Sequence, residues 1–303
     1  MALHDYLASE VGEDWADGII SRREALRRLA LLGLSVGSAI ALLEACAPAG
    51  GPPISPAVVA SGSAAASGSV GATGSAPRDL TGESITFAGP SAELRGYVAS
   101  AETPRGAVLV IHENRGLNDH IRSVASRLAA DGYSALAIDL LSEEGGSEAL
   151  AQGEVQAALS AASPERLVGD MKAGLTELER RAPGAKLGIV GFCFGGGMVW
   201  TLLDAGEPRL AAAIPFYGPA PSSPDFTGDK AAVLAIYAQL DDRVNASRPA
   251  AEAALVAAGL EHEIKVYPGV DHAFFNDTGP RYNAVQAAAA YADVLAWLGH
   301  HLG

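Results

Sequence analysis

A cysteine stands between two glycines in the segment Gly191-Phe192-Cys193-Phe194-Gly195-Gly196-Gly197. The segment follows the apolar run 186–190 and precedes a stretch expected to be helical. A nucleophile elbow has this order, and its turn is too strained and crowded for side chains two residues to either side of the nucleophile. The N-terminus of the following helix favours a thiolate. The pattern therefore predicts that Cys193 is a nucleophile rather than a structural cysteine.

A nucleophilic thiol needs a base, and the base needs an acid to orient it. Of the seven histidines, only His272 lies in a loop just beyond a late predicted strand. The preceding strand is followed by two aspartates, of which Asp241 is the preferred acid and Asp242 the alternative. The resulting chain order of nucleophile, acid and histidine is the order found in α/β-hydrolases.

The composition limits the classes of protein to consider. The chain has 303 residues, of which 49% are hydrophobic and 18% charged, as in soluble globular proteins. Its formal net charge is −14, whereas a nucleic-acid-binding protein is typically basic. No metal, cofactor or nucleic-acid partner is predicted.

Apolar runs alternate with helical patterns after residue 79, which predicts one α/β domain over residues 79–303. Continuously apolar strands suit a doubly wound, mostly parallel sheet. The chemistry of such sheets lies at the carboxyl ends of the strands. The expected strands are Ser84–Phe87, Glu93–Ser100, Ala107–His112, Ser134–Asp139, Lys186–Phe192, Leu210–Tyr217, Ala231–Tyr237 and Glu261–Tyr267. The expected helices are Asp119–Asp131, Pro164–Arg181, Gly195–Ala205, Ala246–Ala258 and Pro280–His300.

Residues 1–46 show the features of a bacterial export signal in the required order. The heptapeptide Ser21-Arg22-Arg23-Glu24-Ala25-Leu26-Arg27 resembles a twin-arginine signal. The apolar run that follows, Leu29–Leu43, has 15 residues, whereas a membrane span needs about 20. The run ends in Leu43-Glu44-Ala45-Cys46, which resembles a lipobox and makes Cys46 the predicted lipidation site. Ordinary cleavage near Ala47 or Ala49 is the alternative.

Residues 47–78 consist almost entirely of Ala, Gly, Ser, Pro and Val. Such a composition forms no core and predicts a flexible linker. Together with the signal it predicts an exported protein, periplasmic or at the cell surface, whose only membrane contact is a lipid on Cys46.

Several motifs in order resemble the dienelactone hydrolase (carboxymethylenebutenolidase) family of the α/β-hydrolase superfamily. The likeness runs from about Ile85 to Trp297. The motifs are His112-Glu113-Asn114-Arg115-Gly116-Leu117, Ala137-Ile138-Asp139-Leu140, GFCFGGG at 191–197, Phe216-Tyr217-Gly218, Asp241-x-x-Val244 and His272-Ala273-Phe274.

The resemblance implies hydrolysis of esters or lactones, with Cys193 attacking the carbonyl and His272, oriented by Asp241, moving the protons. It also implies an oxyanion hole made of the backbone N–H groups of Phe194 and Asn114. The family's glutamate that holds the resting thiol is matched by Glu113, for which a pairing with Arg115 is the simpler alternative.

The expected substrate contacts depart from the family pattern. Where the family has a substrate-binding arginine, this chain has Asn276. Arg281 lies five residues further on, as a substitute or as a cap of the last helix, and Arg115 is the other candidate. Residues 139–165 contain no Lys or Arg but include Glu143, Glu144, Glu148 and Glu154, so we expect an anionic substrate to be repelled there.

The sequence supports three hypotheses about function. The first is a hydrolase of small-molecule carboxylic esters or lactones, acting through a covalent acyl-enzyme. The second is a thioesterase or another acyl hydrolase that uses the same triad. The third is a surface lipoprotein that binds ligands without catalysis. The third is disfavoured because all three triad residues are present.

Overall fold

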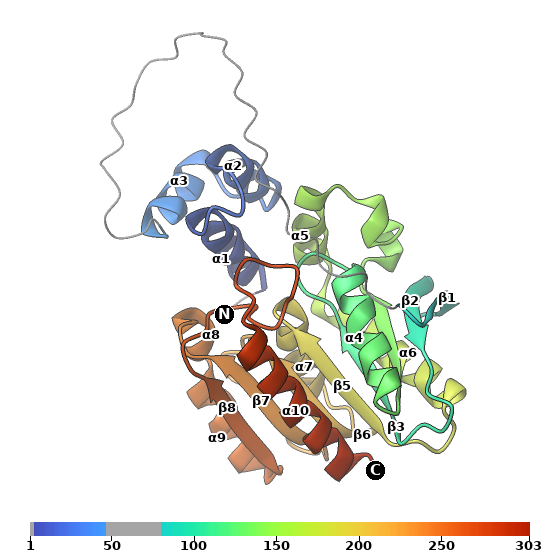
Figure 1. Cartoon of the computed structure of the whole chain (residues 1–303). Coiled ribbons are helices and arrows are strands. Elements are labelled where there is room, and N and C mark those ends of the chain that lie inside the picture. The colour runs from blue at the N-terminus through green and yellow to red at the C-terminus, as the bar shows by residue number, and fades with distance from the viewer. Residues whose placement is uncertain (1–2, 47–79) are drawn as a thin grey trace, which may run out of the picture.

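An eight-stranded sheet forms the centre of the computed structural model, which describes residues 3–46 and 80–303 (Figure 1). The strand order is β1-β2-β4-β3-β5-β6-β7-β8. The pairs β1–β2 and β2–β4 are antiparallel and all other neighbours are parallel. The strands are β1 Glu83–Ala88, β2 Glu93–Ala99, β3 Gly106–Ile111, β4 Tyr133–Asp139, β5 Leu187–Phe192, β6 Leu210–Phe216, β7 Ala232–Ala238 and β8 His262–Tyr267.

Helices cover both faces of the sheet, as the apolar strands require. Every residue of β3, β4, β5 and β7 is buried. Helices α4 (Asp119–Ala130) and α10 (Ala284–His301) cover one face (Figure 1). Helices α6 (Pro164–Arg181) and α7 (Phe194–Asp204) pack against each other and against the other face. The arrangement confirms the predicted doubly wound, mostly parallel α/β fold.

Two helices of the domain were not predicted: α5 (Gln152–Ala161) and the single turn α8 (Asp242–Asn245). Helix α9 covers Arg248–Ala258, and two 3-10 turns cover Ser142–Glu144 and Ser147–Ala149. The last helix begins at Ala284 rather than at the predicted Pro280. The cause is Asn283, whose side chain accepts a hydrogen bond from the backbone N–H of Gln286 and caps the helix.

The strand register places the ends of five strands at one edge. Ile111 of β3 pairs with Gly191 of β5, and Phe192 of β5 pairs with Phe216 of β6. On the far side, Ala238 of β7 pairs with Tyr267 of β8. The loops after these strands therefore meet at one edge of the sheet, which we call the catalytic edge.

Residues 3–46 form three helices: α1 (Leu3–Ala16), α2 (Arg22–Leu31) and α3 (Val36–Ala45). The predicted apolar run is divided between α2 and α3, because Ser35 caps α3 by accepting from the backbone N–H of Ser38. Within the described residues no helix is both long enough and apolar enough to span a bilayer. Helix α1 lies across the catalytic edge (Figure 1). The export signal stays a prediction, and the predicted linker lies outside the described residues.

Candidate active site

Cys193 occupies the turn between β5 and α7 with an unusual backbone conformation. Its φ is 57° and its ψ is −119°, a region that a residue with a side chain rarely adopts. Such strain costs about 1–3 kcal/mol and occurs mostly at functional sites. The backbone N–H of Cys193 donates to the carbonyl oxygen of Phe216 at 3.0 Å. The next residue, Phe194, begins α7, so its N–H has no acceptor within the helix.

The flanking glycines are required by backbone that lies close to them. A Cβ at Gly191 would lie 2.1 Å from the carbonyl oxygen of Gly195. A Cβ at Gly195 would lie 2.5 Å from the carbonyl oxygen of Ile111, at the end of β3. The crowding expected from the sequence around the elbow is therefore present on both sides of Cys193.

The structure brings Asp241 to His272. Asp241 follows β7, and its Oδ2 lies 2.6 Å from Nδ1 of His272. Both side chains are buried, whereas Asp242 is exposed at the start of α8. Oδ1 of Asp241 also accepts from the backbone N–H of Val244 at 3.1 Å, which fixes the carboxylate at the start of α8. Of the two predicted acids, Asp241 is the one that contacts the imidazole.

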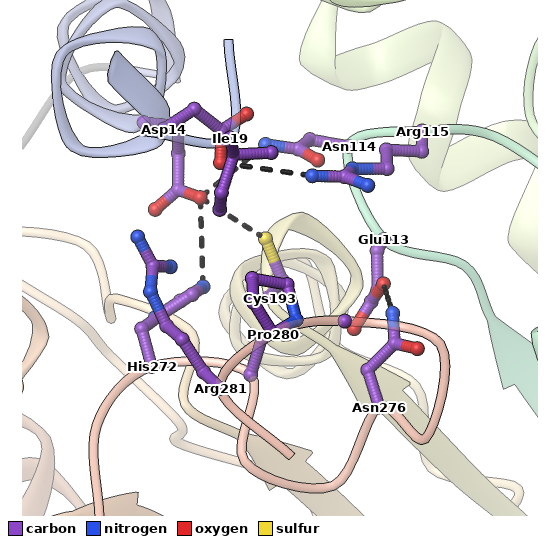
Figure 2. Close-up of a pocket in the computed structure, with 13 residues that line it drawn as sticks. Asp14, Ile19, Glu113, Asn114, Arg115, Cys193, His272, Asn276, Pro280 and Arg281 are labelled. Atoms are coloured by element: carbon purple, nitrogen blue, oxygen red, sulfur yellow. Dashed lines mark hydrogen bonds and ion pairs between the residues drawn. The ribbon is translucent and has the colours of Figure 1, made fainter. Parts of the chain in front are cut away.

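Glu113 lies beside Cys193 in the same small cavity but does not hold the thiol. Its Oε2 accepts a hydrogen bond from Nδ2 of Asn276 at 2.5 Å (Figure 2). The alternative pairing with Arg115 is wrong, because Arg115 contacts Asp14 of α1 at 3.7 Å. Asn276 thus holds the glutamate at a position where an arginine was expected.

Two residues of α1, Tyr6 and Glu10, contact the thiol. Oη of Tyr6 lies 3.1 Å from Sγ of Cys193 and forms a hydrogen bond with it. Oε2 of Glu10 lies 3.7 Å from the same sulfur and 3.6 Å from Nε2 of His272. The side-chain amide of Asn114 donates to Glu10 at 3.3 Å. Figure 2 shows the sulfur of Cys193 pointing toward α1.

Tyr6 and Glu10 were not predicted as site residues, because the sequence pattern of residues 1–46 indicates an export signal. One signal could have revealed them. The first 20 residues contain five acidic residues and no Lys or Arg, whereas the start of a signal peptide is basic.

The carboxylates of Glu10 and Asp241 determine which groups of the site carry a proton. Burial alone disfavours the imidazolium, but Glu10 and Asp241 outweigh it and raise the pKa of His272 well above its ordinary value. Burial raises the pKa of the Cys193 thiol, and Glu10 adds to this effect while His272 opposes it. The arrangement therefore favours an imidazolium next to a neutral thiol, with Glu10 as a counter-ion of the imidazolium.

Both predicted substrate-binding arginines line the cavity at Cys193. Arg281 forms an ion pair with Asp17 just after α1, so it does not cap the last helix. A third arginine, Arg243, pairs with Glu10 and with Glu13 of α1, the latter at 2.7 Å. The two arginines that line this cavity, and Arg243 next to Glu10, are thus all paired with acidic residues from 10–17.

The expected repulsion of anions by residues 139–165 has no structural basis. Glu143 and Glu144 pair with Arg166, and Glu148 pairs with Arg122. None of the four glutamates of this stretch lines the cavity at Cys193. The reason is that the stretch folds into the 3-10 turns and α5, which direct these side chains elsewhere.

Metal-ligating atoms come together twice within the described residues. Glu10, Cys193 and His272 present ligand atoms within 4.8 Å of one another, as do Glu261, His300 and His301 at the surface. At the first group, Oε1 of Glu10 is paired with Arg243 and Oε2 accepts a hydrogen bond from Asn114.

Comparison with known proteins decides the family. The profile of the Dienelactone hydrolase family matches residues 94–302. The chain belongs to the dienelactone hydrolase family. A Saccharolobus solfataricus protein named "Putative carboxymethylenebutenolidase" is 31% identical over 254 residues, covering 71% of this chain and 97% of that protein. An Escherichia coli K12 protein of the same name is 32% identical, covering 67% of this chain and 80% of that protein.

A solved structure has the same fold. The dienelactone hydrolase from Anabaena variabilis superimposes with a TM-score of 0.60 at 20% identity, covering 73% of this chain and 98% of that one. The match to the dienelactone hydrolase family begins at residue 94, so α1, α2 and α3 lie outside it. The protein is a hydrolase of this family, and its N-terminal helices are an addition to the matched domain.

Proposed function

We propose that the protein hydrolyses carboxylic esters or lactones through a covalent acyl-enzyme on Cys193. The observation that carries the proposal is the hydrogen bond of 2.6 Å between Asp241 and His272, formed at the same edge as the strained cysteine elbow. A nucleophile, a base and an acid with these contacts are what acyl transfer requires.

The reaction divides into acylation and deacylation. The thiolate of Cys193 attacks the carbonyl carbon, and the negative charge moves to the carbonyl oxygen. The backbone N–H groups of Phe194 and Asn114 stabilise that oxyanion, a contribution of about 3–4 kcal/mol per donor. The imidazolium of His272 protonates the departing alkoxide, and the C–O bond breaks. Neutral His272 then takes a proton from water as the water oxygen attacks the thioester carbon. The resulting oxyanion collapses, the C–S bond breaks, and the acid leaves while Cys193 returns as a thiolate beside the imidazolium.

Arg115 and Arg281 are the proposed substrate-binding residues. Both guanidinium groups belong to residues that line the cavity of Cys193, which supports a role near a substrate's polar end. Glu113, buried and held by Asn276, is proposed to receive the thiol proton when a substrate arrives.

An esterase assay on the full chain tests this function, with neutral p-nitrophenyl acetate and the anionic dienelactone as substrates. The chain contains a matched control, because it has one other cysteine. We expect Cys193→Ala to abolish turnover and Cys46→Ala to leave it unchanged. Turnover that persists in Cys193→Ala would refute the proposed nucleophile.

We also propose that residues 1–46 direct export and that Cys46 carries a lipid. Arg22 and Arg23 are exposed at the start of α2, which supports recognition by an export receptor. The test is fractionation of a bacterial host that has the twin-arginine pathway. Replacing both arginines by lysine should retain the protein in the cytoplasm, and Cys46→Ala should release it from the membrane fraction. Equal distribution of all three forms would contradict the proposal.

A further inference from the structure

Helix α1 closes the catalytic edge in the full chain. The cavity next to Cys193 has a volume of about 30 Å³, and Glu10, Asp14 and Ile19 line it from the N-terminal side. A site for a small-molecule ligand has about 300–1,000 Å³. The remaining space holds roughly one or two water molecules. A substrate carbonyl therefore cannot reach Cys193 while α1 is in place.

Apolar side chains bury one side of α1, which packs against α2, α3 and helix α5 of the domain. Tyr6, Leu7 and Val11 are each no more than 1% exposed. Leu3 and Tyr6 also line a second, apolar cavity of about 150 Å³, together with Phe194 and other residues of α7. The apolar space beside the nucleophile is thus partly filled by α1 itself.

Glu10 occupies the position where the reaction takes place. One of its carboxylate oxygens is within 3.7 Å of Sγ of Cys193, within 3.6 Å of Nε2 of His272, and bonded to the amide of Asn114. Its charge is compensated by Arg243, whose guanidinium also lies over the ring of Tyr6 at 4.7 Å. Arg243 and His272 outweigh burial and lower the pKa of Glu10 to about 2, so the carboxylate is charged at neutral pH.

The Glu10 side chain fills the site, and its charge also opposes formation of the Cys193 thiolate. Acyl transfer requires a thiolate paired with the imidazolium of His272. Here the Glu10 carboxylate is the anion beside that imidazolium, and it raises the pKa of Cys193 further. The nucleophile is thereby kept in its unreactive thiol form.

The acidic residues within 10–17 form ion pairs with arginines around the catalytic edge. Glu10 and Glu13 both pair with Arg243. Asp14 pairs with Arg115, and Asp17 pairs with Arg281. The acidic positions are spaced by three, one and three residues, which places those within α1 on one helical face. Three arginines, one in α8 and two in separate loops, thus pair with acidic residues of α1 and with Asp17 just after it.

We propose that α1 is a built-in inhibitor of the hydrolase, in which Glu10 occupies the site of the reacting carbonyl group and the enzyme becomes active when α1 leaves the catalytic edge. This inference rests on the proposed function, because the inhibited step is attack by Cys193. Thirty-three residues, 47–79, connect α3 to the described domain. A chain of that length can reach about 110 Å, so α1 can leave without unfolding the domain. Cleavage before Cys46, as the proposed lipoprotein signal requires, would make the release permanent.

The test uses the full chain with single substitutions and two readouts. The first is the rate at which iodoacetamide modifies Cys193, measured by mass spectrometry of its peptide. The second is turnover of p-nitrophenyl acetate. Glu10→Gln keeps the shape and leaves Arg243 its partner Glu13. Asp5→Asn is the matched control, because Asp5 is exposed on the same helix and, within the described residues, its side chain contacts only its neighbour His4.

We expect Glu10→Gln to increase both rates about ten- to hundredfold, the range that corresponds to a lost charge-assisted hydrogen bond. Asp5→Asn should stay within about twofold of the parent chain. Leu7→Asp tests the apolar packing of α1 separately, because it puts a charge at a fully buried position of α1, and it should increase both rates as well.

The outcomes separate the two proposals. Turnover that depends on Cys193 but is equal in the parent, Glu10→Gln and Leu7→Asp would overturn the inhibitor and leave the proposed function intact. Faster modification of Cys193 in both variants, without turnover in any form, would overturn the proposed function while supporting closure of the thiol by α1.

Discussion

Replacing Asp241 by asparagine removes one charge from the site and almost no volume. The carboxylate Oδ2 lies 2.6 Å from Nδ1 of His272, and both side chains are at most 4% exposed. An amide oxygen can still accept from the backbone N–H of Val244, so the start of α8 should persist. The change therefore affects the imidazole rather than the fold.

The expected loss has two parts. A buried hydrogen bond to a charged group contributes about 1.5–3 kcal/mol, which corresponds to roughly ten- to 150-fold in rate. In addition, an amide at this position allows the tautomer of His272 that cannot accept a proton at Nε2. In a serine protease the equivalent substitution lowers kcat about 10⁴-fold. We therefore expect Asp241→Asn to lower kcat by about 10²- to 10⁴-fold.

The assay compares kcat on p-nitrophenyl acetate for Asp241→Asn and Asp242→Asn, each made in Glu10→Gln protein and measured relative to it, with thermal melting as a check of folding. Asp242 is exposed and one residue away, so its substitution should change kcat by no more than about twofold. A loss in Asp242→Asn as large as in Asp241→Asn, or none in Asp241→Asn, would refute the assignment of the acid.

Three further predictions concern packing and protonation. Gly195→Ala should cost about 1–3 kcal/mol in denaturant unfolding, since its Cβ would lie 2.5 Å from backbone of β3. Gly197→Ala, whose Cβ would have no contact closer than 3.4 Å, should cost little; equal losses would contradict this. Burial raises the pKa of Asp170 to about 6 from 3.8 despite Arg166, so charging this carboxyl destabilises the folded state as pH rises through that window. Asp170→Asn should therefore stabilise the protein by up to about 3 kcal/mol at pH 7 and much less at pH 4, and a gain independent of pH in thermal melts would contradict the assignment. Because Glu10 raises the pKa of Cys193, Glu10→Gln should move the pH midpoint of iodoacetamide modification downward, and an unchanged midpoint would count against that coupling.

The sheet and the elbow could be predicted because their signals are local. The strands are short apolar runs between turn residues, and all eight were found in the structure. The elbow combines a strand, a strained turn and a helix within about a dozen residues. Asp241 and His272 could be chosen because each follows a strand whose end must lie at the catalytic edge. Such signals depend on neighbours in the chain and on the rules of parallel sheets.

The position of α1 could not be predicted because it depends on distant partners. Arg243 lies 233 residues from Glu10, and nothing in its own neighbourhood indicates that it faces an N-terminal helix. The division of the apolar run between α2 and α3 likewise reflects a serine cap and packing on the domain. Sequence patterns report the propensity of a segment, whereas tertiary contacts decide where an amphipathic helix docks.

Trapping the acyl-enzyme tests whether Cys193 is the nucleophile. Glu10→Gln protein is mixed with p-nitrophenyl acetate, quenched in acid within the burst phase, digested and analysed by mass spectrometry. We expect an acetyl group on the peptide that carries Cys193, formed as fast as p-nitrophenol is released and lost on a longer incubation. An acetyl group on another residue that forms and decays at the rate of turnover, with Cys193 unmodified, would contradict this assignment.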